Sequence, residues 1–152
     1  MSLDVNVREI IGSDFQTIEA GSSAADAASL ISQKPVGCLV VVENDHAVGI
    51  VTEQDIVTEV TANKVDPSKI YVRDIMSTPV MAVRNDNTLK EAAEMMATYK
   101  VHRLVVVEGN GAVAGVITTE DLASWISKDG AKSQEVSRPR GPEEMGAMGP
   151  YQ

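Results

Sequence analysis

The sequence predicts an α+β protein built from two β-α-β-β-α repeats that pack through their sheets with pseudo-two-fold symmetry. The first observation is duplication, because residues 7–11 (VREII) return as 72–76 (VRDIM) and residues 39–42 (LVVV) return as 104–107. The second is that each copy alternates short β-branched runs with helical periodicity. The third is size, since one unit of about 55 residues buries too little surface to be stable alone.

The duplication divides the chain into four segments. Two are repeats, joined by a connector that contains Asp66-Pro67, and the last is a tail rich in Gly, Pro, Ser and charge. The predicted bounds are residues 5–62 for repeat one, 63–71 for the connector, 72–127 for repeat two and 128–152 for the tail. The tail lacks apolar periodicity, so we expect it to be disordered. It is either dispensable or a docking arm that uses Met145, Met148 and Tyr151.

Each repeat is expected to begin with a short extended segment followed by a helix. The extended segments are residues 15–18 and 80–83. Ser22 and Ser23 offer N-caps for the helix of repeat one. Both helices have an apolar face, as expected for a helix that packs on a sheet. These faces are formed by Ala24, Ala27, Ala28 and Ile31 in repeat one and by Leu89, Ala92, Ala93 and Met96 in repeat two.

The second half of each repeat is predicted to be a β-hairpin that leads into another helix. Residues 36–42 and 101–107 are dense β-branched runs, which is typical of strands buried on both faces. Tight turns follow at Asn44-Asp45 and Gly109-Asn110-Gly111. Another apolar strand then runs into a second helix in each copy, at Thr52 and Thr118.

The composition argues against several classes of function. The 152-residue chain has a formal net charge of −9 at pH 7, which disfavours extended nucleic-acid binding because phosphate backbones are repelled. We see no apolar run long enough to cross a bilayer and no signal peptide, so we expect a cytoplasmic protein. The sequence has no phosphate-binding glycine loop, nucleophile elbow or metal-spaced Cys/His cluster, so we expect neither catalysis nor a bound metal. Cys38, the single cysteine, is expected to be a buried, inert thiol.

A repeated Thr-x-x-Asp is the clearest polar signal. Thr52 and Asp55 lie where a strand meets a helix, and so do Thr118 and Asp121. One interpretation is a capping box, in which the Thr caps the helix and the acid bonds back to the cap N–H. The other is a ligand site, in which the Asp accepts hydrogen bonds from the two hydroxyls of a ribose. The two interpretations are compatible.

A single His-Arg pair is the second polar signal. His102 and Arg103 stand at the start of an apolar strand, where charged side chains are costly unless they are exposed or paired. An Arg side chain can bind phosphate through two parallel hydrogen bonds, and a His side chain provides a further hydrogen-bond donor near neutral pH. The alternative is an Arg that bonds a nearby acid. Repeat one has Gly37-Cys38 at the equivalent positions, so phosphate contacts are expected to be asymmetric.

These motifs together resemble a tandem pair of cystathionine-β-synthase-type (CBS) domains, also called a Bateman module. Residues 72–80 resemble the family's opening motif and residues 102–107 its central strand. Residues 49–56 and 115–122 resemble its G-h-h-T-x-x-D-h signature, where h is apolar. The likeness covers residues 5–127, and we expect a stand-alone module.

The resemblance implies two clefts between the repeats that take an adenosine-containing ligand. The candidates are AMP, ADP or ATP first, and then NAD or S-adenosylmethionine. By the resemblance, Asp55 and Asp121 bond the ribose. The phosphate candidates are Thr52, Thr118, His102 and Arg103, and the adenine-lining candidates are Val36, Val101 and Ala82. Because the family's His-Arg pair reaches across to the opposite repeat, we expect Arg103 to serve the Asp55 cleft and to make it the better equipped of the two.

Two functional hypotheses follow. In the first, the protein is a regulatory sensor whose bound adenosine ligand shifts the packing of the repeats and thereby modulates a partner protein. In the second, it is a ligand-free adaptor that dimerises and recruits partners, and both Asp residues are only helix caps. The resemblance favours a homodimer in either case.

Overall fold

The computed structural model describes residues 2–12, 15–34 and 36–133. Its elements confirm the predicted α+β class and the order β-α-β-β-α in both repeats. The strands are β1 (Thr17–Glu19), β2 (Cys38–Glu43), β3 (His46–Thr52), β4 (Ala82–Arg84), β5 (Arg103–Val107) and β6 (Val113–Thr118). The helices are α1 (Ala24–Gln33), α2 (Glu53–Ile56), α3 (Leu89–Tyr99) and α4 (Thr119–Ser133), and α2 continues into a π-helical turn, Val57–Thr61.

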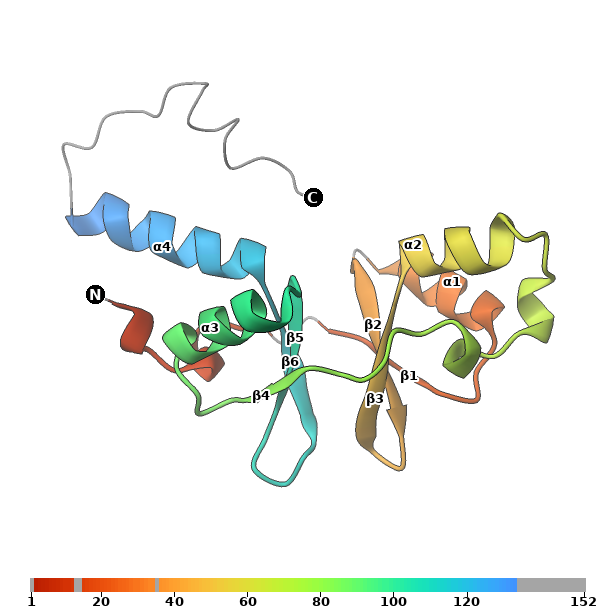
Figure 1. The fold of residues 1–152 in the computed structure, drawn as a ribbon, viewed down its shortest axis with the longest axis horizontal. Helices are drawn as coiled ribbons and strands as arrows, with labels where there is room; N and C mark the ends of the chain where they lie inside the picture. Colours follow the sequence, from red (N-terminus) through yellow and green to blue (C-terminus); the bar gives the residue numbers. More distant parts are fainter. Residues whose placement is uncertain (1, 13–14, 35, 134–152) are drawn as a thin grey trace, which may run out of the picture.

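Each repeat forms a three-stranded mixed sheet with helices on its outer face. The strand orders are β1-β2-β3 and β4-β5-β6; the first pair in each sheet is parallel and the second antiparallel. Figure 1 shows the two sheets facing each other at the centre, with α1 and α2 outside one and α3 and α4 outside the other. The hairpins lie together at one end of this arrangement, and α2 and α4 begin at the other end.

The two central strands are buried on both faces because their side chains alternate between two cores. Leu39 and Val41 of β2 point into the core of repeat one, whereas Val40 and Val42 point toward the facing sheet. There they share a cluster with Val105 of β5. The continuous apolar runs in the sequence therefore serve both the helix layer and the interface between the repeats.

The segments that precede the two repeats dock on the opposite halves of the molecule. We call residues 5–11 and 70–76 the lead segments. Val7 is fully buried in the core of repeat two, and its N–H donates to the carbonyl of Asn87 at 2.8 Å. Val72 is fully buried in the core of repeat one, and its N–H donates to the carbonyl of Ser22 at 2.8 Å. The sequence pattern groups residues 5–11 with repeat one, but in space they complete repeat two.

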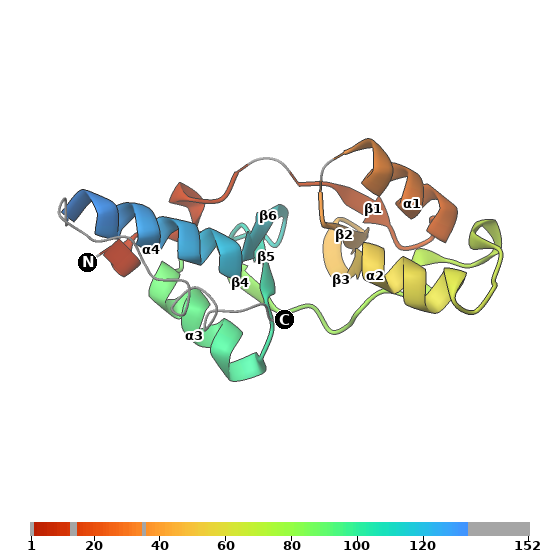
Figure 2. The same cartoon turned by 90° about the horizontal axis from the view of Figure 1, so that it is seen from above.

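The repeated glycines of β3 and β6 make this docking possible. A Cβ placed on Gly49 would lie 2.8 Å from Cγ of Met76, and one placed on Gly115 would lie 3.2 Å from Cδ1 of Ile11. Beside Gly49, Ile50 and Ser77 exchange backbone hydrogen bonds of 3.2 and 2.8 Å. The chain then crosses to β4, as the yellow-green trace in Figure 2 shows. A Cβ at Gly49 would require Met76 to move, whereas one at Gly115 would require a smaller shift of the Ile11 side chain.

Local structure confirms the predicted turns and shifts some predicted boundaries. Asn44 and Asp45 both have positive φ (53° and 65°), as a two-residue hairpin turn requires. The buried strands begin later than expected, at Cys38 and Arg103, so Val36 and Val101 precede them. Helix α4 continues through Ser133, so the first residues of the predicted tail are helical. The remainder of that tail, with Met145, Met148 and Tyr151, lies outside the described residues.

The crossed docking predicts that a cavity in the second lead segment loosens repeat one. Ile75 is 5% exposed and packs in that core. Ile75→Ala should lower the free energy of unfolding by about 2–5 kcal/mol, because it leaves a cavity. In hydrogen exchange, α1 and β1–β3 should lose protection before α3 and β4–β6. The matched control is Ile126→Ala, since Ile126 is 47% exposed. Earlier loss of protection in α3 and β4–β6 would contradict the crossed docking.

Candidate functional site

A cleft of about 340 Å³ lies between the repeats, at the end where α4 begins. We call it the Asp121 cleft. Repeat two contributes strand and helix-start residues, and repeat one contributes the approach to β2. The lining residues are Gly12, Phe15, Val36, Gly37, Cys38, Arg103, Val116, Thr118 and Asp121. The cleft therefore combines apolar walls with a few polar groups, which is typical of small-molecule sites.

The antiparallel register of β5 and β6 positions the polar groups. Arg103, the first residue of β5, pairs directly with Thr118, the last residue of β6. The N–H of Thr119 donates to the carbonyl of His102 at 3.0 Å, which holds the start of α4 against β5. The guanidinium of Arg103, the hydroxyl of Thr118 and the carboxylate of Asp121 therefore lie at the same end of the sheet. The register of the hairpin brings them there.

Both Thr-x-x-Asp motifs form the predicted capping boxes. The N–H of Thr118 donates to Oδ2 of Asp121 (2.9 Å), and the N–H of Asp121 donates to Oγ1 of Thr118 (3.1 Å). Thr52 and Asp55 make the same pair of bonds, and the Thr52 hydroxyl also donates to Oδ2 of Asp55 at 3.0 Å. Among the described residues, Oδ1 of Asp121 has no hydrogen-bond donor. The cap fixes the carboxylate and leaves one oxygen available to a ligand.

Of the described residues that line the Asp121 cleft, Arg103 is the only Lys or Arg. It is half-buried, and no described residue forms a hydrogen bond or ion pair with its side chain. The hypothesis of an Arg bonded to a nearby acid is therefore wrong for the described part of the chain. Its Nη2 would lie 3.6 Å from a Cβ on Gly37, so the guanidinium reaches across to repeat one. An unpaired guanidinium in a cleft is suited to an anionic group.

Cys38 faces the same cleft and is half-buried rather than fully buried as predicted. Burial raises the pKa of its thiol, and the positive charge of Arg103 lowers it by a smaller amount. The thiol is therefore predominantly neutral near neutral pH. Its place at the first position of β2, where the strand emerges from the core, explains the partial exposure.

The structure brings together four of the nine predicted site residues in this cleft, namely Val36, Arg103, Thr118 and Asp121. The other five predicted residues do not line it; they are Thr52, Asp55, His102, Val101 and Ala82. His102 is exposed. Arg103 was expected to serve the Asp55 cleft; the register places it beside Thr118 in its own repeat, and it lines the cleft of Asp121.

Sequence reasoning missed part of the lining. Phe15, Cys38 and Val116 were not predicted to contribute. Val116 follows from strand alternation, since it lies two residues before Thr118 on the same face of β6. Phe15 carried no comparable signal, because its position depends on how the chain crosses between the repeats.

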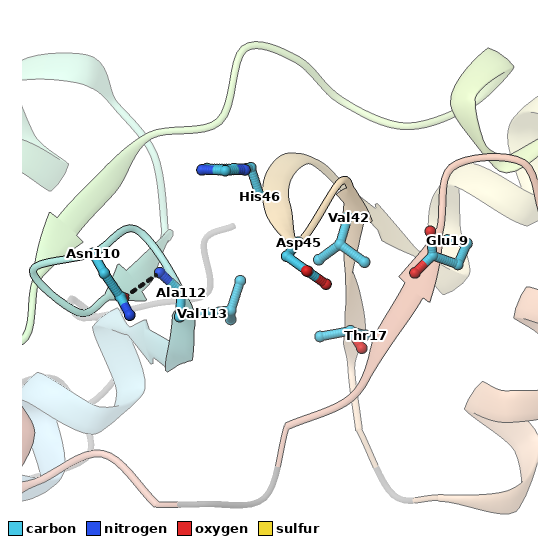
Figure 3. A pocket seen from close by; sticks show the side chains of 8 residues that line it. All are labelled: Thr17, Glu19, Val42, Asp45, His46, Asn110, Ala112 and Val113. Carbon is cyan, nitrogen blue, oxygen red and sulfur yellow. Dashed lines mark hydrogen bonds between the residues drawn. The ribbon is translucent and has the colours of Figure 1, made fainter.

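A second cleft, of about 490 Å³, lies at the hairpin end. Figure 3 shows that its walls come from both hairpins and from β1. His46 is exposed, and a Cβ on Gly111 would lie 3.4 Å from its ring carbon Cδ2. Glu19 and Asp45 are the two carboxylates of the lining, and no described residue bonds to either. The lining residues that the structure describes include no Lys or Arg, so this part of the hairpin cleft is acidic.

Within residues 2–12, 15–34 and 36–133, no three His, Cys, Asp or Glu side chains are grouped so that they could hold a metal ion. No helix in this part of the chain has the length and apolar character that a membrane crossing needs.

The fold and the cleft define a module of two related repeats with a ligand-sized cavity between them. The chain belongs to the CBS-domain family, whose family model matches residues 7–62 and 72–128. A CBS domain-containing protein of Bacillus subtilis is 30% identical over 129 residues, which cover 84% of this chain and 91% of the relative. An uncharacterized protein of Methanopyrus kandleri is 34% identical over 119 residues, covering 78% of this chain but only 61% of the relative's length.

Solved structures show the same fold. A CBS-domain protein from Burkholderia ambifaria has a TM-score of 0.71 and 27% identity, covering 82% of this chain and 96% of its own. The CBS domain pair of a protein solved with 5′-methylthioadenosine and S-adenosyl-L-methionine has a TM-score of 0.71 and 24% identity, with coverage of 82% and 98%. At 24% identity, the similarity to this second structure shows a shared fold and nothing more.

The neighbourhood of Cys38 predicts a specific pH profile for alkylation. Because the thiolate is the reactive form and burial raises the pKa of Cys38, the rate with iodoacetamide should reach half its maximum at a higher pH than for a free cysteine. Arg103→Gln removes the opposing positive charge, so the midpoint should rise further. Arg84→Gln is the control, since Arg84 is exposed and pairs with Asp86. An unchanged or lower midpoint in Arg103→Gln would contradict this electrostatic coupling.

Proposed function

We propose that this CBS pair is a regulatory sensor that binds an adenosine-containing ligand in the Asp121 cleft. The observation that carries the proposal is the meeting of Arg103, Thr118 and Asp121 with the apolar Val36 in one cleft between the repeats. The candidates are AMP, ADP or ATP, with NAD and S-adenosylmethionine as alternatives. The protein with bound 5′-methylthioadenosine and S-adenosyl-L-methionine supports the general class of ligand.

Each group in the cleft has a proposed role. The free oxygen of Asp121 accepts hydrogen bonds from the ribose hydroxyls, because the capping box already holds the carboxylate in place. Arg103 binds the anionic group of the ligand, and the Thr118 hydroxyl contacts the same group. Val36 and Phe15 supply apolar surface for the base.

The cleft's position between the repeats supports a regulatory role. The ligand would touch residues of both repeats, so it binds one relative packing of the sheets better than another. Such a ligand shifts the equilibrium by its difference in affinity for the two arrangements. We propose that a partner protein responds to this shift, and that the module acts in the cytoplasm as a homodimer. The hexameric CBS-CP12 protein of bloom-forming cyanobacteria is an example of assembly in a related fold.

The proposal does not include catalysis. Matches to enzymes are partial; inosine-5′-monophosphate dehydrogenase of Nitrosopumilus maritimus matches over 27% of its length at 26% identity. The adaptor hypothesis remains the competing function, and it is favoured by the capping boxes, which give Asp55 and Asp121 a structural role without any ligand.

Calorimetry with AMP, ATP, NAD and S-adenosylmethionine tests the proposal. At least one of these ligands should bind the wild-type protein. Asp121→Ala should weaken that binding roughly 10- to 100-fold, because hydrogen bonds to a charged group contribute about 1.5–3 kcal/mol. The matched control is Asp55→Ala, which loses the equivalent cap, about 1 kcal/mol of stability, but leaves the Asp121 cleft intact.

The outcomes separate the two hypotheses. Weaker binding in Asp121→Ala with retained binding in Asp55→Ala supports the sensor. If none of the four ligands binds, or if Asp121→Ala binds as wild type does, the sensor hypothesis is wrong. Equal losses of stability in the two variants without any ligand binding would leave the adaptor as the function.

A further inference from the structure

The Asp121 cleft holds little charge with which to bind an anion. Among the described residues, its lining has one cation, Arg103, and one carboxylate, Asp121. The other described lining residues are apolar or neutral, and burial keeps the Cys38 thiol protonated by raising its pKa. The formal charge of the described lining is therefore zero. A single guanidinium matches one phosphate, because its fork of N–H donors engages one anionic group at a time.

Among the described residues, the cations that neighbour the lining in sequence do not supply further positive charge to the cleft. Lys34, Lys100 and His102 are exposed, and none of them lines the cleft. In water, exposed charges interact weakly and are screened by salt. The chain as a whole carries a net charge of −9, which repels a highly charged anion.

The hairpin cleft is still less suited to a polyphosphate. Its described lining residues include the carboxylates of Glu19 and Asp45 and no Lys or Arg, although it is the larger of the two cavities. Figure 3 shows both acidic side chains on the repeat-one side of this cleft. In the part of the chain that the structure describes, neither cavity has the several convergent cations that a di- or triphosphate chain needs for charge compensation.

We infer that the Asp121 cleft selects adenosine ligands with at most one phosphate, and that it discriminates against di- and triphosphates. This inference rests on the proposed function and narrows its class of ligand. The discrimination arises because the guanidinium of Arg103 neutralises the charge of the first phosphate. Each further phosphate adds negative charge near Asp121, and no described lining residue supplies a second cation to pair with it. The cleft then binds a monophosphate more tightly than a di- or triphosphate, because the additional phosphates remain unpaired.

Gly37 offers a position at which to reverse this preference. It is exposed, and a Cβ there would make an ordinary contact of 3.6 Å with Nη2 of Arg103. Gly37→Lys therefore adds a second cation to the cleft without disturbing the fold. The matched control is Gly109→Lys, because a Cβ on Gly109 meets no atom within 4 Å and the residue does not line the Asp121 cleft.

The test is calorimetry with adenosine, AMP and ATP at one ionic strength, without divalent cations. In the wild type, ATP should bind at least about tenfold more weakly than the tighter of adenosine and AMP. Gly37→Lys should strengthen ATP binding about tenfold relative to adenosine binding. Gly109→Lys should change neither affinity. Circular dichroism of both variants confirms that they fold.

The outcomes distinguish this inference from the proposed function. If ATP binds the wild type as tightly as AMP or more tightly, the selection is wrong while the adenosine site stands. If Gly37→Lys and Gly109→Lys change ATP binding equally, the preference reflects the net charge of the chain and not the cleft, which also overturns the inference. If adenosine, AMP, ATP and the other adenosine ligands all fail to bind, the proposed function fails and this inference fails with it.

Discussion

The docking of each lead segment on the opposite half of the molecule is the constraint on which the rest of the structure depends. Val7 and Val72 are both fully buried, each in a core whose strands come from elsewhere in the chain. Residues 70–76 finish repeat one before the chain crosses to start repeat two. The repeats are therefore joined by interlocked cores as well as by the apolar layer around Val40 and Val105.

This interlocking determines which residues line the Asp121 cleft. Chain segments that cross between the repeats bring Gly12 and Phe15 to the wall of the Asp121 cleft, while β5 and β6 bring Arg103 and Thr118. The polar groups are held by secondary structure: strand pairing places Arg103, and the helix cap places Asp121. A site built this way is pre-organised, so that a ligand does not have to order its contacts on binding.

Much of the fold was predictable because it is encoded locally and twice. Alternating β-branched runs, turn residues such as Asn44-Asp45 and the Thr-x-x-Asp caps each specify a local structure, and all three predictions are confirmed. The crossed docking was not predictable, since the lead segments share one apolar pattern and each pattern fits either core. Deciding between the two cores requires knowledge of the path of the chain in space.

The candidate site was predictable in residue type but not in arrangement. Thr118, Asp121 and Arg103 were identified from their chemistry, and the structure places them together. They line the same cleft because Arg103 pairs with Thr118 across the hairpin. That pairing depends on the strand register, which the length of the hairpin turn sets. The same register explains why Arg103 lies with Asp121 and not with Asp55.

The most direct test of a ligand site shared by both repeats is a crystal structure of the protein with bound AMP. In that structure we expect the ribose hydroxyls to lie within hydrogen-bond distance of Asp121 and the phosphate to lie beside Arg103. We also expect Val36 or Cys38 of repeat one to contact the ligand. AMP bound in the hairpin cleft, or held by residues of one repeat alone, would contradict it.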